Sequence, residues 1–272
     1  MTANTANLTN AEADVILKKM CPAYGVPIIL RRGMKKPQVI GSGVAFTKQN
    51  RQFVITAAHV VDEFDAPDVS LYTFPDKQQP MFGNRLHVTG TYKHRSSDIG
   101  VLELANPLPQ SQCDEDHCVN MSDLSQHHDV GTITFLVHGF PEASQDESPL
   151  MPGVIQCTHV AVATNYREMR DEPYGSDGKF YDGPTIILDY GPEIWQRYHM
   201  AYYTRFGETH HPAGLSGGGV WHIANKKGQL ITASDTLKLV GIQSHCAPND
   251  YLRAVPITEA LEIIDQDILG TP

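Results

Sequence analysis

Short apolar runs separated by turn residues fill most of the chain from residue 26 to residue 255. They are rich in Val, Ile, Leu, Phe and Thr and are bounded by Gly, Pro, Asp or Asn, which is typical of β-strands joined by turns. No two runs are separated by a helical pattern long enough for a crossover between parallel strands. The pattern therefore predicts an all-β protein of antiparallel strands, arranged in barrels or sandwiches. The expected strands are VPIIL, VIGSGVAF, QFVITAA, VSLYTF, RLHVTGTY, IGVLEL, TITFLVHGF, VIQCTHVAVAT, TIILDY, GGVWHIA and LKLVGIQS.

Helical spacing of apolar residues marks the two ends of the chain. Near the N-terminus, Asn10 is a suitable helix cap and Pro22 a helix end, and one side of the segment between them is apolar at Ala13, Val15, Ile16 and Met20. Near the C-terminus, Pro256 suits the first turn of a helix expected over residues 256–266, whose apolar positions are Ile257, Ala260, Leu261 and Ile264. We therefore expect short N-terminal and C-terminal helices around the β-rich region.

A polar stretch at residues 106–129 divides the strand-rich region in two, because it is poor in strand-forming residues. The expected divisions are an N-terminal tail and helix (1–25), a first β unit (26–110), a linker (111–129), a second β unit (130–255) and a C-terminal helix (256–272). A second polar stretch, residues 165–183, is expected to form a long surface loop.

The charge balance bears on the partners of this protein. The 272 residues carry 21 Lys and Arg against 31 Asp and Glu, a formal net charge of −10. Nucleic acid and anionic membranes attract basic surfaces, so neither is expected as a partner. No apolar run approaches the roughly 18 residues of a membrane-spanning helix, and the N-terminal residues lack the pattern of a secretory signal. With five cysteines, an odd number, we expect reduced thiols and a cytoplasmic location.

Three short stretches carry residues suited to nucleophilic catalysis. VITAAHVVDEF places His59 just after a predicted strand, SSDIGVLEL places Asp98 just before one, and PAGLSGGGVW places Ser216 in a glycine-rich turn. A serine hydroxyl is a weak nucleophile that needs a base within hydrogen-bond reach, and a histidine can serve as that base. A buried carboxylate then fixes the tautomer of the histidine.

The glycine-rich turn also suits the stabilisation of a negatively charged intermediate. Backbone N–H groups in such a turn can approach an oxyanion closely because no side chain intervenes. The expected donors are the N–H groups of Gly214 and Ser216. Each residue alone has a simpler structural explanation, and it is their order and context that indicate an active site.

These stretches resemble the motifs of the chymotrypsin-like (trypsin-fold) serine peptidases, whose chain order is His, Asp, Ser. TAAHVV is similar to the histidine motif, DIGVLEL to the aspartate motif and GLSGGGV to the nucleophile motif. GSGVAF, VHGFP and VGIQS resemble further strands and turns of that fold, so the resemblance covers residues 38–255. It implies two six-stranded antiparallel β-barrels with the active site in the cleft between them. It also implies that His59 is the general base, Asp98 orients it, and Ser216 is the nucleophile.

The sequence departs from the digestive members of that family before the nucleophile. Leu215 stands where those members have an aspartate that pairs with a new N-terminus after zymogen cleavage, so that switch cannot operate here. No cysteine pair flanks His59, and few residues follow the second unit. The chain therefore resembles the intracellular, bacterial or viral branches, and a full-length HtrA-type protease with a PDZ domain is not expected.

Counting from the nucleophile motif suggests which residues bind the substrate. The resemblance places His210, Ser244 and His245 near the primary specificity pocket, where no acidic residue is present to favour Lys or Arg. Histidines there would favour an acidic side chain. The alternative is that His210 and His211 are exposed loop residues.

The expected function is a serine endopeptidase that hydrolyses polypeptide substrates through an acyl-enzyme without a cofactor. One alternative is a catalytically silent binding or scaffold module, and another is a latent protease effector that a protein partner activates. An α/β-hydrolase esterase fits less well, because its nucleophile elbow leads into a helix whereas a strand pattern follows Ser216. Cys113 and Cys118 leave open a zinc site, although an incidental cysteine-rich loop or an adventitious disulfide is the preferred explanation.

Overall fold

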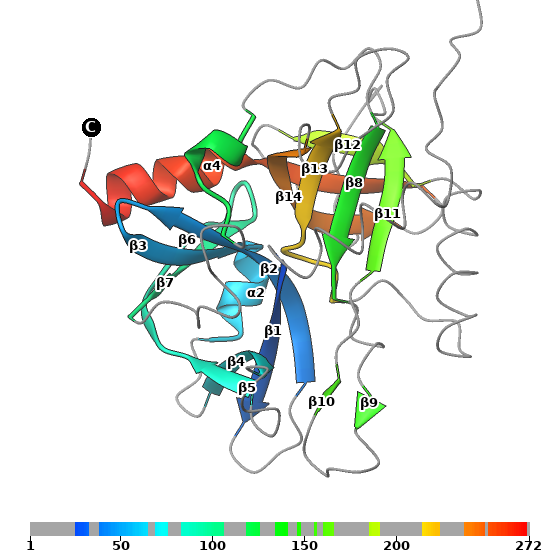
Figure 1. Cartoon of the computed structure of the whole chain (residues 1–272). Helices are drawn as coiled ribbons and strands as arrows, with labels where there is room; N and C mark the ends of the chain where they lie inside the picture. The colour runs from blue at the N-terminus through cyan, green and yellow to red at the C-terminus, as the bar shows by residue number, and fades with distance from the viewer. Residues whose placement is uncertain are drawn as a thin grey trace, which may run out of the picture.

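The structure is a computed structural model, and it describes residues 25–32, 38–64, 69–75, 83–105, 118–125, 134–140, 146–147, 155–156, 160–165, 185–190, 214–223, 237–247 and 250–270. These residues are mostly β-structure in two large antiparallel sheets, shown in Figure 1. The predicted all-β class with antiparallel strands is therefore confirmed. The predicted N-terminal helix lies outside the described residues, as does the predicted loop at 165–183 apart from Asn165.

The first sheet has seven strands in the order β5-β4-β1-β2-β3-β7-β6. Its edge strands, β5 and β6, follow one another in the chain with only His87 between them. A single bent stretch of chain thus pairs with β4 at one end and with β7 at the other. The strands are β1 (Gly25–Arg32), β2 (Gln38–Lys48), β3 (Arg51–Thr56), β4 (Val69–Pro75), β5 (Gly83–Leu86), β6 (Val88–His94) and β7 (Ile99–Leu104).

The second sheet has six strands in the order β11-β8-β13-β14-β15-β12. Its two edge strands lie close together, as shown by the hydrogen bond that the Thr164 hydroxyl of β11 donates to the Asp189 carbonyl of β12. The strands are β8 (Thr134–Gly139), β11 (Val160–Asn165), β12 (Ile186–Asp189), β13 (Gly219–Ile223), β14 (Leu237–Ala247) and β15 (Tyr251–Pro256). A separate hairpin joins β9 (Asp146–Glu147) to β10 (Ile155–Gln156).

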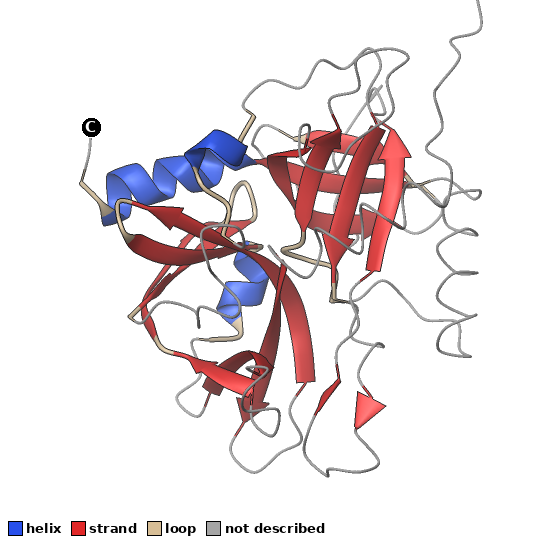
Figure 2. Ribbon diagram, viewed as in Figure 1, coloured by secondary structure: helices blue, strands red, loops and turns tan. Residues whose placement is uncertain are grey.

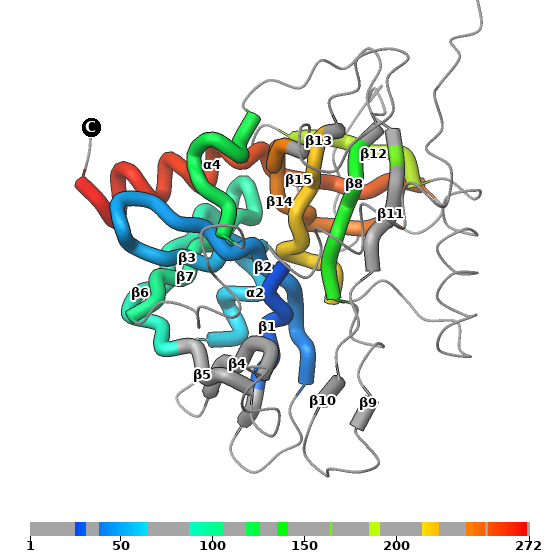
Figure 3. The backbone as a smooth tube through the Cα atoms, in the orientation of Figure 1, coloured from blue at the N-terminus to red at the C-terminus, as the bar shows by residue number. Residues whose placement is uncertain are grey.

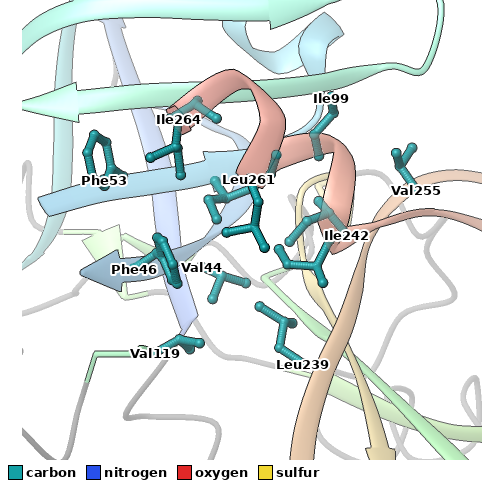
Figure 4. Packing of buried hydrophobic residues seen from close by; sticks show 14 of the residues in the cluster. Val44, Phe46, Phe53, Ile99, Val119, Leu239, Ile242, Val255, Leu261 and Ile264 are labelled. Atoms are coloured by element: carbon teal, nitrogen blue, oxygen red, sulfur yellow. The ribbon is translucent and has the colours of Figure 1, made fainter. Parts of the chain in front are cut away.

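The alternation of side chains along the strands separates two apolar clusters of the first sheet. Val44, Phe46, Phe53 and Ile55 face the second sheet and the C-terminal helix, whereas Ala45 and Val54, between them in sequence, face the inside of the first sheet. Figure 4 shows the shared cluster, in which Val44 and Phe46 lie near Leu239 and Ile242 of β14. The two sheets are therefore joined by one continuous apolar core.

The C-terminal helix follows β15 of the second sheet but packs on the first sheet (Figures 2 and 3). It begins as α4 (Ile257–Glu262) and continues as a π-helix, η3 (Ile263–Ile268), in which the Leu269 N–H donates to the Ile264 carbonyl. Leu261 and Ile264 lie in the shared cluster, and Asp265 pairs with Lys48 at the end of β2. The helix predicted over 256–266 is thus present and links the two sheets.

Part of the predicted linker is packed against both sheets rather than exposed. Val119 is buried and forms an isolated bridge with Phe46, and Leu124 forms one with Leu239. Between them lies a short 3-10 helix, η1 (Met121–Asp123). Cys118 is disulfide-bonded to a partner outside the described residues, which corrects the expectation that all thiols are reduced.

Candidate active site

His59 lies on a short helix that the strand QFVIT leads into. Helix α2 (Ala58–Asp62) follows β3 and buries Ala58, Val60 and Val61, so His59 is the most exposed residue of the helix, with 48% of its side chain exposed. The helix packs closely on β7, because a Cβ at Gly100 would lie 2.4 Å from Val61 Cγ2. This packing fixes the direction in which the imidazole points.

Asp98 holds both the ring and the backbone of His59. The Nδ1 atom of His59 lies 3.1 Å from each carboxylate oxygen, and the His59 backbone N–H donates to Oδ1 across 3.1 Å. The Asp98 side chain is only 4% exposed, so this contact is shielded from water on the carboxylate side. A carboxylate in this position favours the proton on Nδ1, which leaves the lone pair of a neutral ring on Nε2.

The backbone of Asp98 has an unusual conformation, with φ of 60°. Residues other than glycine rarely adopt positive φ, although Asp and Asn tolerate it better than others. The turn is secured by a hydrogen bond from the Ala58 N–H to the Asp98 carbonyl, 3.2 Å long. Strain of this kind persists only where the surroundings hold it, and it is common at functional sites.

Ser216 lies in a turn whose glycines are required by their surroundings. Gly214 and Gly217 have φ of +91° and +89°. A Cβ on Gly217 would lie 1.9 Å from the Ser42 carbonyl oxygen and 2.1 Å from Thr56 Oγ1, which no side chain can accommodate. Leu215, between the glycine and the serine, is buried in the apolar cluster of the second sheet. This anchor leaves Ser216 partly exposed at the tip of the turn.

The Ser216 turn and the His59 helix meet at Gly41 of β2. A Cβ on Gly41 would lie 2.7 Å from Val60 Cγ2 and 3.1 Å from the carbonyl oxygen of Ser216. His59, Asp98, Gly214 and Ser216 are therefore brought into one region.

The peptide groups of the turn have a defined orientation. The Leu215 carbonyl accepts from the Gly218 N–H across 2.9 Å. Because a trans peptide directs its N–H opposite to its carbonyl, the Ser216 N–H points away from Gly218. Among the described residues, neither the Ser216 nor the Gly214 N–H has an acceptor. The turn thus leaves two neighbouring donors available to a ligand.

The residues predicted to bind substrate have separate locations. His210 lies outside the described residues. Ser244 is buried, and its hydroxyl accepts a hydrogen bond from Arg253 Nη1 across 3.0 Å. His245 is partly buried, with its ring 6.3 Å from that of Tyr251. The structure therefore places the Ser244 side chain against Arg253, and the binding roles of all three residues stay predictions.

Two residues near the site were missed by the motifs. Ser42, in the GSG sequence of β2, is buried and contacts the turn that carries Ser216. Arg253, on β15, is also buried and donates from Nη2 to the Ser97 carbonyl, next to Asp98, across 3.2 Å. A polar residue between two glycines in an apolar strand, and an arginine within the apolar run YLRAVP, are the sequence signals that could have indicated them.

Neither a metal site nor a membrane-spanning helix is found in the described residues. No group of three or more His, Cys, Asp or Glu side chains there could hold a metal ion. Cys118 is bonded to another cysteine, and a disulfide sulfur is not the thiolate that zinc requires, which argues against the alternative of a zinc site at this residue. Of the helices described, none is both long and apolar enough to cross a bilayer.

In comparisons with known proteins, no protein-family model and no curated protein matches the chain.

Proposed function

We propose that this protein is a serine endopeptidase of the chymotrypsin-like fold, with His59, Asp98 and Ser216 as its catalytic triad. The observation that carries the proposal is the contact of His59 Nδ1 with the buried Asp98 carboxylate, beside the glycine turn that presents Ser216. A buried carboxylate on one ring nitrogen and a serine approaching from another element are the arrangement that activates a hydroxyl.

The arrangement of the sheets supports the two-barrel fold. In the first sheet, the edge strands β5 and β6 are consecutive in the chain and can be counted as one bent strand. The seven segments then correspond to six strands around a closed barrel. In the second sheet, the Thr164–Asp189 contact joins the edges of six strands. Each sheet would then be one six-stranded barrel, with α2 and the Ser216 turn between them.

The proposed reaction proceeds in two steps. The Ser216 Oγ attacks the carbonyl carbon of the scissile peptide, and its proton passes to His59 Nε2. The carbonyl oxygen becomes negative and accepts hydrogen bonds from the N–H groups of Gly214 and Ser216. His59 then gives its proton to the leaving amine, and water hydrolyses the acyl-enzyme by the same route. Asp98 keeps the ring oriented and stabilises the imidazolium while it exists.

Covalent labelling with a fluorophosphonate probe, read by intact mass, tests the proposal. We expect one adduct per chain in the wild type and none in Ser216→Ala or His59→Ala. The matched control is Ser122→Ala, which removes an exposed hydroxyl on η1 and is expected to label like the wild type. An adduct that persists in Ser216→Ala would contradict the assignment of the nucleophile. A folded wild type that never labels, alone or with candidate partners, would contradict the catalytic function.

A further inference from the structure

Ser42 is a buried residue at the centre of the contacts between the two sheets and the nucleophile turn. Its side chain and backbone are fully shielded from solvent, at 0% exposure. The Ser42 N–H donates to the Ser216 carbonyl across 2.7 Å, and the Ser42 hydroxyl donates to the Gly214 carbonyl across 2.7 Å. The same hydroxyl accepts from the Phe140 N–H across 2.7 Å, and the Ser42 carbonyl accepts from Thr56 Oγ1 across 2.6 Å.

These contacts hold two carbonyl groups of the turn on its inner side. The Gly214 carbonyl faces the Ser42 hydroxyl and the Ser216 carbonyl faces the Ser42 N–H. The backbone of a glycine has more accessible φ and ψ angles than that of other residues. Gly214 and Gly217 therefore do not by themselves keep the adjoining peptide groups in one orientation. If the Gly214–Leu215 peptide turned over, its carbonyl would face outward, beside the position where an oxyanion forms, and would repel it.

The hydroxyl also ties this orientation to the alignment of the sheets. Ser42 lies on β2 of the first sheet, whereas Phe140 directly follows β8 of the second. The fit is close, because a Cβ on Gly139 would lie 2.9 Å from Ser42 Oγ and 3.1 Å from Leu215 Cδ2. One hydroxyl therefore links both sheets to the turn.

We infer that Ser42 is a positioning residue, whose hydroxyl keeps the Gly214 carbonyl inward and therefore away from the position, beside the Gly214 and Ser216 N–H groups, where the oxyanion forms. This inference rests on the proposed function. Its effect falls on the reaction step rather than on ground-state binding, because the oxyanion exists only after attack. Loss of the hydroxyl should slow that step about 10- to 100-fold, the scale of a small misplacement in an active site.

The kinetic test compares Ser42→Ala and Ser42→Thr with the wild type, by the saturation kinetics of fluorophosphonate labelling. We expect Ser42→Ala to lower the maximal labelling rate by about 10- to 100-fold with little change in the half-saturating probe concentration. Ser42→Thr keeps a hydroxyl and should recover most of the rate. The matched control is Thr164→Val, which removes another buried hydroxyl donor, to the Asp189 carbonyl, away from the turn. Equal maximal rates in Ser42→Ala and wild type would overturn the inference.

A second measurement does not depend on catalysis. Hydrogen–deuterium exchange should rise in the peptide that contains Gly214–Gly218 in Ser42→Ala, but not in Thr164→Val. If the wild type is never labelled while this exchange rises, the proposed function fails and the structural role of Ser42 stands. If exchange in the turn is unchanged, the inference fails whatever the labelling shows. Should Ser42→Ala not fold, Ser42→Cys replaces it, since a thiol is a much weaker donor of similar size.

Discussion

Arg253 of β15 donates a hydrogen bond to the carbonyl of Ser97, the residue that precedes Asp98. The arginine belongs to the second sheet, whereas Asp98 lies in the turn between β6 and β7 of the first, so this turn is held from across the core. The same guanidinium donates to the Ser244 hydroxyl, and both donor and acceptors are buried. This relationship makes Arg253 a structural support of the His59–Asp98 pair.

Replacement of Arg253 should therefore destabilise the protein. Arg253→Met keeps much of the volume but leaves the Ser97 carbonyl and the Ser244 hydroxyl without their donor. Buried polar groups left in this way cost about 1–3 kcal/mol each in the free energy of unfolding. Urea denaturation followed by circular dichroism measures the change. The exposed Arg95→Met, which loses a surface contact with Asp62, is the control and should change stability by less than about 1 kcal/mol. Equal midpoints for both variants would contradict the expected role.

Asp98→Asn should separate the charge of residue 98 from its shape. Asparagine tolerates the positive φ of this position nearly as well as aspartate, so the turn should be kept. The amide cannot stabilise the imidazolium of His59 and favours the wrong tautomer, which lowers rates by about 10⁴-fold in enzymes of this mechanism. We expect fluorophosphonate labelling to slow by roughly 10³- to 10⁴-fold, with thermal stability close to the wild type. Labelling at an unchanged rate would exclude Asp98 from the triad.

Gly217→Ala and Gly270→Ala form a matched pair of glycine substitutions. Both residues have positive φ, but a Cβ on Gly217 would overlap the Ser42 carbonyl, whereas a Cβ on Gly270 would meet nothing within 4 Å. Gly270→Ala should cost only the backbone penalty of about 1–2 kcal/mol. Gly217→Ala should cost several kcal/mol or prevent folding, because backbone atoms must also move. Thermal denaturation of both variants checks this, and equal costs would show that the turn adapts.

The Cys246 thiol should react slowly in the folded protein. Burial raises the pKa of this thiol from 9.0 to about 12, because the surrounding atoms disfavour the thiolate. Alkylation by iodoacetamide requires the thiolate. The native labelling rate of the peptide containing Cys246 should therefore keep rising with pH between 9 and 11, while the rate in urea should level off above pH 9–10.

The same shift has a consequence for stability. The folded-state pKa of Cys246 exceeds the unfolded-state value. The contribution of the protonated thiol to the free energy of unfolding is therefore complete below pH 9 and is lost as the pH rises from 9 towards 12. Denaturation midpoints of the wild type and Cys246→Ala should converge over that range. A labelling rate that levels off at the same pH in native and unfolded protein would show that the pKa is not raised.

Much of the local structure was determined by the sequence itself. Period-two alternation in VIGSGVAF and QFVITAA places Val44 and Phe53 on one side of the sheet, because successive side chains of a strand must point to opposite faces. The positions of His59 after a strand, Asp98 before one and Ser216 in a glycine turn were also readable, since each follows from residues close in the chain. That these three residues come together was an expectation that local patterns could not test.

The tertiary structure alone decided which distant residues support that site. Strand β15 was not among the expected strands, because Arg253 interrupts an apolar run. Its burial is compatible with the fold because distant residues, Ser97 and Ser244 among them, supply hydrogen-bond partners. Ser42 looked like one residue of a strand, and its contacts with Gly214 and Phe140 join segments far apart in the chain. The linker residue Val119 lay in a polar stretch but is buried beside Phe46. Such contacts depend on how the sheets pack, and no periodicity within one segment encodes the identity of its partner across the core.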